Sequence, residues 1–129
     1  MIFLLGEISW SYEELLNELN SKEFFYDNFA CDDLREFYVN LIFALINNSE
    51  ITLVDSDISE HEKLANSIVS NQKIVVDNPK KIDILSDFFQ HLKQSKSVIS
   101  LYTSGTTGVP KKISHSFQNL SKNIKISEN

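Results

Sequence analysis

The chain has 129 residues, of which 42% are hydrophobic and 11% aromatic, a composition that excludes a disordered polymer and suffices for one modest globular domain. Its formal net charge is −6, so the chain as a whole is not expected to bind nucleic acid. Cys31 is the single cysteine, which excludes an internal disulfide and favours a reducing, cytoplasmic location; the residue is expected to be small and buried rather than reactive.

The first third of the chain predicts two helices and two extended segments. Residues 2–10 favour extended structure, and a Ser11-x-x-Glu14 capping box then begins a short helix. Residues 24–26 form a candidate buried strand whose aromatic side chains are expected in the core. The most strongly amphipathic pattern of the sequence predicts a helix over residues 34–46, ended by two asparagines. Its buried stripe is expected to consist of Leu34, Phe37, Tyr38, Leu41, Ile42 and Leu45.

The middle of the chain alternates strands and helices. Residues 51–54, 73–76 and 98–102 predict buried strands. One predicted helix begins at the capping box Ser59-x-x-Glu62, and another precedes the last of these strands. Their apolar positions are Leu64, Ala65, Ile68 and Val69 in the first helix, and Ile82, Leu85, Phe88, Phe89 and Leu92 in the second. This alternation favours an α/β fold with a largely parallel sheet.

A glycine-rich loop follows the strand predicted at residues 98–102. Its sequence is Tyr102-Thr103-Ser104-Gly105-Thr106-Thr107-Gly108-Val109-Pro110-Lys111, which holds two of the chain's three glycines. Hydroxyls, accessible backbone amides and one ammonium group suit an anion with several oxygens. The spacing of the glycines differs from that of the Walker P-loop. A plain surface turn is the alternative interpretation of this composition.

Other polar residues favour structural roles. Asp55 and Asp57 follow a predicted strand directly, so turn formation is preferred to a pair of catalytic carboxylates. The three histidines, His61, His91 and His115, are scattered without ligand spacing, and no metal site is predicted from them. No apolar stretch approaches the length needed to cross a membrane, so no membrane-spanning segment is expected.

The loop at residues 102–111 resembles, along its whole length, the phosphate-binding signature of the adenylate-forming enzymes: acyl-CoA synthetases, adenylation domains of peptide synthetases, and luciferases. Residues 112–120 are similar to that family's continuation, in which a short strand leads into a helix; here the apolar positions of the helix would be Phe117, Leu120 and Ile124. Residues 10–15 resemble, more weakly, an early helix start of the family. Lys112 and Phe117 depart from the family pattern.

The resemblance implies that residues 1–129 form one unit, a part of the larger amino-terminal α/β domain of an adenylate-forming enzyme that finishes shortly after the phosphate-binding loop. It implies ATP, accompanied by Mg²⁺, as the nucleotide held by the loop. The residues implied to bind the β- and γ-phosphates are Thr103, Ser104, Gly105, Thr106, Thr107, Gly108 and Lys111.

Enzymes of this family activate a carboxylic acid as an acyl-adenylate and then pass it to the thiol of coenzyme A or of a carrier protein. The resemblance places the catalytic and metal-binding residues in later segments of the ligase. It therefore assigns no catalytic residue to this chain and implies that activity requires the remainder of the ligase. The alternative is a non-catalytic, truncated or degenerate module that binds phosphate weakly or serves as an interaction domain.

Overall fold

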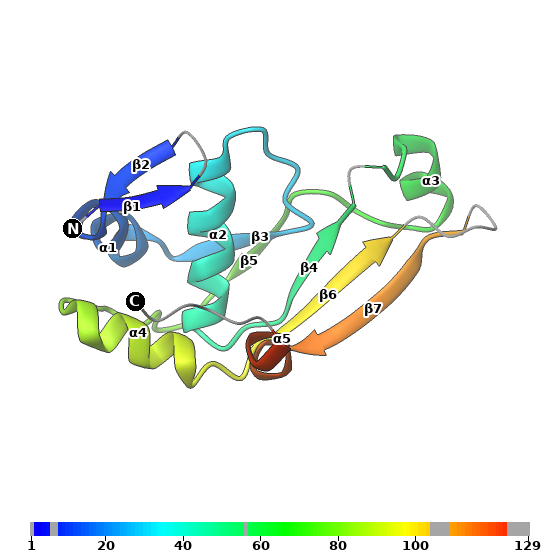
Figure 1. Cartoon of the computed structure of the whole chain (residues 1–129). Helices are drawn as coiled ribbons and strands as arrows, with labels where there is room; N and C mark the ends of the chain where they lie inside the picture. The colour runs from blue at the N-terminus through cyan, green and yellow to red at the C-terminus, as the bar shows by residue number, and fades with distance from the viewer. Residues whose placement is uncertain (1, 6–7, 56, 104–108, 124–129) are drawn as a thin grey trace.

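The computed structural model describes residues 2–5, 8–55, 57–103 and 109–123, with side chains described from residue 11 to residue 120 of those ranges. Five helices and seven strands alternate along this part of the chain (Figure 1). The strands are β1 (Ile2–Leu5), β2 (Ile8–Ser11), β3 (Phe24–Asp27), β4 (Ile51–Val54), β5 (Gln72–Val75), β6 (Val98–Thr103) and β7 (Lys111–Ser116). The helices are α1 (Tyr12–Ser21), α2 (Leu34–Ile46), α3 (Glu60–Ala65), α4 (Leu85–Lys93) and α5 (Phe117–Asn123).

The described strands form three small sheets. β1 pairs with β2, and β3 pairs with β5, both in antiparallel orientation. The third sheet has the order β4-β6-β7, in which β4 and β6 are parallel and β7 is antiparallel to β6. The prediction of an α/β fold with alternating helices and strands is confirmed.

A largely parallel sheet is not found among the described strands, for two reasons. After α3 the chain does not pair with β4 again, and β5 instead pairs antiparallel with β3 in a separate sheet. After the glycine-rich loop the chain folds straight back, so that β7 forms a hairpin with β6. Each return adds an antiparallel pair where the strand-helix alternation had suggested another parallel strand.

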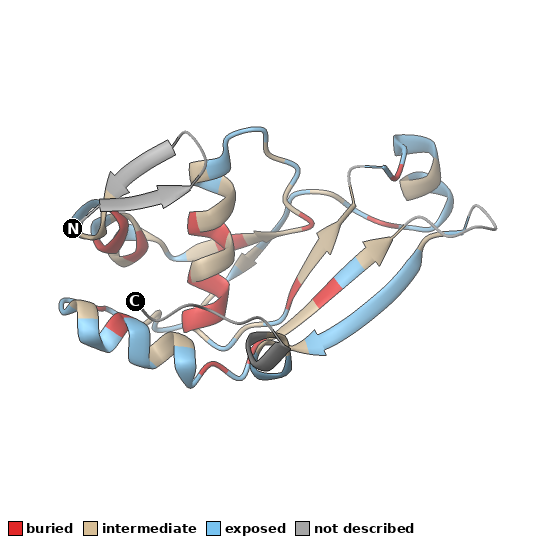
Figure 2. Ribbon diagram, viewed as in Figure 1, coloured by how far each residue is buried: buried red, intermediate tan, exposed pale blue. Residues whose placement is uncertain are grey.

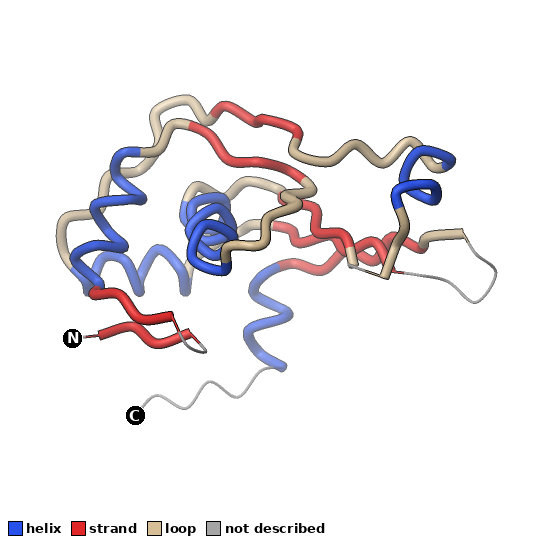
Figure 3. The backbone as a smooth tube through the Cα atoms, turned by 90° about the horizontal axis from the view of Figure 1, so that it is seen from above, coloured by secondary structure: helices blue, strands red, loops and turns tan. Residues whose placement is uncertain are grey.

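Helix α2 crosses the centre of the molecule, and Figure 2 shows buried residues along it. Its deeply buried side chains are Val39, Asn40, Phe43, Ala44, Leu45 and Ile46. Of these, Val39, Phe43, Ala44 and Ile46 pack against α1, β3, β4, α4 and the segment before α4, through Leu15, Leu19, Phe25, Ile51, Phe88 and Ile82. These residues form the hydrophobic core from which the β4-β6-β7 sheet extends (Figures 1 and 3).

The predicted helix at residues 34–46 is confirmed, but the predicted stripe is not its most buried face, although Leu41 and Ile42 are partly buried and pack against the core. Leu34 is 47% exposed, and Leu45 alone of the predicted stripe is buried. The polar Asn40 lies on the face that is in fact buried, and it is only 2% exposed. A pattern based on apolar residues treats Asn40 as a sign that its face of the helix is exposed. The pattern therefore centred the buried face on the other side of the helix.

The start of α2 depends on the carboxylate of Asp33, which accepts hydrogen bonds from the amides of Arg35 at 2.9 Å and Glu36 at 3.2 Å. Replacing Asp33 with alanine should lower the free energy of unfolding by about 1 kcal/mol, because both amides lose their partner. Chemical unfolding in urea measures the effect. The exposed neighbour Asp32, replaced with alanine, makes the same change in charge and should shift stability by less than about 0.5 kcal/mol. Equal effects of the two changes would contradict the capping role.

Two predicted helices begin or end at other residues than expected. α3 ends at Ala65, and Asn66 caps it by donating from its side chain to the Glu62 carbonyl at 2.8 Å. The backbone then turns through a positive φ of 57° at Ser67, so Ile68 and Val69 lie outside the helix. A positive φ at a non-glycine residue is incompatible with continuing a right-handed helix.

Ile82 is buried as predicted, but it precedes α4 rather than belonging to it. Its backbone is held by Asn20 of α1, which donates to the Ile82 carbonyl at 2.7 Å and accepts from the Ile82 amide at 2.8 Å. The helix begins only at Leu85. At the end of the described chain, α5 contains Phe117 and Leu120, two of the three apolar positions predicted for a helix there, whereas Ile124 lies outside the described residues.

No helix in the part of the chain that the structure describes combines the length and the apolar character needed to cross a lipid bilayer.

Candidate functional site

The candidate site is the loop that joins β6 to β7. Five of its seven predicted phosphate-binding residues, Ser104, Gly105, Thr106, Thr107 and Gly108, lie outside the described residues. The other two, Thr103 and Lys111, end β6 and begin β7. The structure therefore defines the two strands that carry the loop and the orientation of the side chains at its entry and exit.

Thr103 and Lys111 stand opposite each other in the hairpin. They are cross-strand partners, and the Thr103 hydroxyl donates to the Lys111 carbonyl at 3.4 Å. Opposite residues of an antiparallel pair have their side chains on the same face of the sheet, with Cβ atoms about 5 Å apart. The hydroxyl and the ammonium group predicted to contact phosphate thus leave the sheet on one face, and Lys111 is exposed there.

Lys112 leaves the sheet on the opposite face. It pairs across the hairpin with Tyr102, and its Nζ atom lies 5.7 Å from the centroid of the tyrosine ring. Successive residues of a strand point to opposite faces, so the two neighbouring lysines cannot serve the same face of the sheet. Lys111 is the lysine placed to act together with Thr103.

The loop lies at the carboxyl ends of the parallel pair β4 and β6. Beyond Val54 the ladder continues by one hydrogen bond, from the Asp55 amide to the Tyr102 carbonyl at 2.9 Å. The Asp55 carboxylate then accepts from the Asp57 amide at 3.0 Å, and its carbonyl accepts from the Ile58 amide at 3.0 Å. The turn predicted at these residues is confirmed.

A cleft of about 570 Å³ adjoins this turn and is lined in part by Asp55, Asp32, Glu60 and Lys63. The Lys63 ammonium group is paired with the Glu60 carboxylate at 3.0 Å. The remaining carboxylates make the lining acidic, which disfavours a polyphosphate. The geometry therefore favours the Thr103 and Lys111 face, rather than this cleft, for the phosphates.

Two serines brace the hairpin, and sequence reasoning did not identify them. Ser100 of β6 and Ser114 of β7 are cross-strand partners, and their hydroxyl oxygens are 2.7 Å apart. Ser100 is buried, so its hydroxyl needs a partner within the protein. In the sequence the two serines lie at the same distance from the loop, one on either side. This symmetry predicts their contact only when the pairing of β6 with β7 is known.

The other titratable residues singled out in the sequence lie apart from the loop or at the surface. His61 and His115 are exposed, and no group of three or more His, Cys, Asp or Glu residues within the described ranges could hold a metal ion. Cys31 is half-buried rather than buried, which corrects the expectation for this residue. Its partial burial raises the pKa of the thiol, so the reactive thiolate is less populated at neutral pH.

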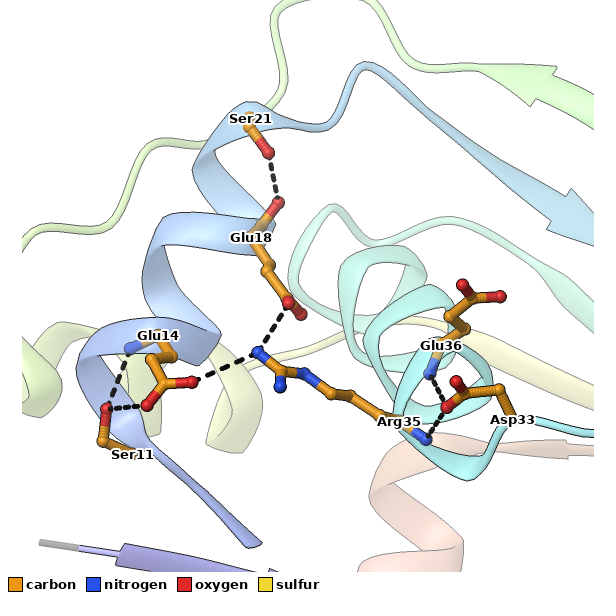
Figure 4. Close-up of polar contacts among 7 residues, drawn as sticks. All are labelled: Ser11, Glu14, Glu18, Ser21, Asp33, Arg35 and Glu36. Carbon is orange, nitrogen blue, oxygen red and sulfur yellow. Dashed lines mark hydrogen bonds and ion pairs between the residues drawn. The ribbon is translucent and has the colours of Figure 1, made fainter. Parts of the chain in front are cut away.

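A second polar cluster joins the two amino-terminal helices (Figure 4). The Arg35 Nη2 atom of α2 lies 2.7 Å from a Glu18 carboxylate oxygen and 3.4 Å from one of Glu14, both on α1. Glu14 and Glu18 are four residues apart and so lie on one face of the helix. The cluster contributes to the packing of α1 against α2, which lie at the opposite end of the molecule from the ends of β6 and β7 that carry the loop (Figure 1).

Comparison of the chain with models of known protein families, with curated proteins and with solved structures finds no match in any of the three. The functional interpretation therefore depends on the loop sequence and on the geometry of the hairpin that carries it.

Proposed function

We propose that this chain contributes the ATP phosphate-binding loop of an ATP-dependent ligase that activates carboxylic acids. The observation that supports the proposal most directly is the placement of Thr103 and Lys111 on one face of the β6–β7 hairpin, at the carboxyl end of a parallel strand pair. Loops at such ends are the usual ligand-binding positions of α/β proteins. The sequence of the loop, which resembles the signature of adenylate-forming enzymes, supplies the ligand class.

In the proposed reaction a carboxylate oxygen forms a bond to the α-phosphorus of ATP, and the bond from that phosphorus to the bridging oxygen breaks. Pyrophosphate leaves with the electron pair, and an acyl-adenylate remains for transfer to the thiol of coenzyme A or of a carrier protein. The chain's part is to hold the β- and γ-phosphates. For this the Thr103 hydroxyl would turn its single proton from the Lys111 carbonyl to a phosphate oxygen, and the Lys111 ammonium group would offset the charge that accumulates on the departing pyrophosphate.

The described residues fit a phosphate group better than a protein-bound metal ion. The loop entry and exit present a hydroxyl and an exposed ammonium group, and the carboxylate of Asp55, which follows β4 beside β6, accepts from the Asp57 amide. We therefore assign the Mg²⁺ to the phosphate oxygens of the nucleotide. Oxygen ligands from phosphates and water are the usual surroundings of this ion.

The proposal also extends to partners and to the larger fold. The carboxylic acid, the acceptor thiol and the catalytic groups would be handled by the remainder of the ligase. The β4-β6 pair would be the part of the larger parallel sheet that this chain contributes.

Titration of the ¹⁵N-labelled chain with magnesium and ATP tests the proposal. ATP and pyrophosphate should shift the backbone amide signals of residues 102–109, 111 and 112, because both ligands carry the linked phosphates that the loop holds. AMP should shift them far less, since it lacks those phosphates. If millimolar ATP left these signals unchanged, or if AMP acted as strongly as ATP, the assignment of the loop would be wrong.

A further inference from the structure

A basic hollow lies at the other end of β6, between the carboxyl ends of α2 and α4. Its volume is about 530 Å³, within the range of small-molecule sites. The side chains that line it are basic or neutral: Lys80, Lys93, Lys96, His91, Asn48 and Gln94. Gln118 of α5 also lines it, and none of the lining residues that the structure describes carries a carboxylate.

Two asparagines at the end of α2 hold the lysines in place. The Asn47 side chain accepts a hydrogen bond from the Lys80 amide at 2.8 Å, and the Asn48 side chain accepts one from the Lys96 amide, also at 2.8 Å. Two segments that are 16 residues apart in the sequence are thereby fixed beside the same helix end. Because their backbones are fixed, the entropic cost of gathering their charges around a ligand is reduced.

The connection from α4 to β6 is fixed just as firmly. The buried Ser95 hydroxyl donates to the Leu45 carbonyl at 2.6 Å, and the Ser97 hydroxyl lies 3.2 Å from the Ala44 carbonyl. These bonds join the segment that carries Lys96 to the last turn of α2. The wall of the hollow is therefore a packed part of the protein rather than a free surface loop.

The charges of this hollow are unusual for an acidic chain. The formal net charge is −6, yet Lys80, Lys93 and Lys96 converge here, and no acidic residue is among the lining residues in the described ranges. Among the described residues, the ion pairs involve Arg35 with Glu14 and Glu18, and Lys63 with Glu60, but neither Lys80 nor Lys96. A concave site lined by one sign of charge concentrates ligands of the opposite sign.

We propose that this hollow binds a small anion with several negative charges, such as an oligophosphate, as a second site distinct from the glycine-rich loop. β6 spans six residues, so its first and last residues are five steps of about 3.3 Å, or roughly 17 Å, apart. One small anion cannot contact both ends. The hollow is therefore independent of the proposed ATP-binding loop.

Helix stabilisation is the competing explanation for these lysines. Cations near the carboxyl end of a helix interact favourably with its dipole, and Lys93 lies in the last turn of α4. That role accounts for Lys93 in the last turn of α4 but does not require Lys80 and Lys96, which lie outside the helices, to line the same hollow. The two explanations differ in whether replacing the lysines changes ligand binding or only thermal stability.

The test is titration of the ¹⁵N-labelled chain with inorganic pyrophosphate, followed at the amides of residues 48, 80, 94 and 96. These signals should shift, and the Lys80→Gln/Lys96→Gln variant should weaken the affinity measured from them at least about tenfold. The Lys22→Gln/Lys73→Gln variant is the control, because it removes the same number of charges from two lysines that lie over the Phe24 ring. It should change the affinity for pyrophosphate less than about threefold. Lys96→Arg retains the charge and should retain binding.

Three results would overturn the proposal. The first is a titration in which only the loop residues 102–112 respond. The second is equal weakening in the two double variants, which would show a general effect of net charge. The third is a twelve-nucleotide single strand that binds the hollow more tightly than pyrophosphate, which would identify a nucleic acid surface. Lys111→Ala should leave the hollow unaffected, so failure of this proposal and failure of the proposed ATP site are distinguishable.

Discussion

Replacing Lys111 with alanine should weaken ATP binding at the glycine-rich loop by about 10- to 100-fold. The loss corresponds to one charge-assisted contact to phosphate, about 1.5–3 kcal/mol. Lys111 is exposed and stands opposite Thr103 on the same face of the hairpin, so its ammonium group is available to a ligand at the loop. The dissociation constant should be taken from the amide shifts of residues 102–109, which report on the loop alone.

The neighbouring lysine provides the matched control. Lys112 has the same charge and is also exposed, but it leaves the opposite face of β7 and lies over the Tyr102 ring. Lys112→Ala should therefore change ATP affinity less than about threefold, the effect of removing one distant surface charge. Should Lys112→Ala weaken binding as much as Lys111→Ala, the phosphates would not lie on the face assigned to them.

Replacing Asn40 with alanine should lower the free energy of unfolding by about 2–4 kcal/mol. Asn40 is buried in α2, where its side-chain oxygen accepts from the Tyr26 amide at 2.7 Å and its amide nitrogen donates to the Tyr26 carbonyl at 3.0 Å. The asparagine thus satisfies both backbone groups of one residue on the edge of β3 that β5 does not cover. Alanine would leave both groups without partners, and each unsatisfied buried group costs about 1–3 kcal/mol.

Urea unfolding measures this loss, with an unchanged dependence on urea concentration showing that the variant still unfolds as one unit. Asn17→Ala, at an exposed position of α1, is the control and should shift stability by less than about 0.5 kcal/mol. A comparable effect of the two substitutions would mean that water replaces the Asn40 hydrogen bonds without loss.

Local signals in the sequence predicted the elements well. The capping serines Ser11 and Ser59 accept hydrogen bonds from the amides of Glu14 and Glu62, at 3.2 Å and 3.1 Å, and begin α1 and α3 as expected. These signals act within one turn of helix, so the residues that decide them are adjacent in sequence. The strands β3 to β6 likewise lie within a residue of their predicted positions.

Features that depend on distant residues were not predictable in the same way. The pairing of β3 with β5, the Asn20 contacts that hold Ile82 outside α4, and the Asn40 contacts to β3 each join segments that are far apart in sequence. Asn20 and Asn40 each hydrogen-bond the backbone of a distant segment in place of a neighbouring strand or helix. A polar residue in a sequence is ordinarily taken to be exposed, so such a role is not expected for it. The same reasoning explains why the predicted stripe of α2 is not its most buried face.

At the candidate site, the sequence identified the residue types, and the structure adds their orientation. The ligand-binding composition of residues 103–111 follows from the residues themselves, since hydroxyls, glycine amides and a lysine suit an anion. The placement of Lys111 and Lys112 on opposite faces of the sheet does not follow from the sequence, because it depends on the register between β6 and β7. The basic hollow could not be foreseen either, as its lysines come from separate segments brought together by Asn47 and Asn48.

The hydroxyl pair of Ser100 and Ser114 places a constraint on the length of the loop. With Thr103 facing Lys111, the two serines also face each other across the hairpin. An insertion or deletion that moved β7 by a single position would turn every side chain of that strand to the other face. Lys111 would then exchange sides with Lys112, and the buried Ser100 would lose its partner. Substitutions in the loop should therefore be tolerated far more readily than changes in its length.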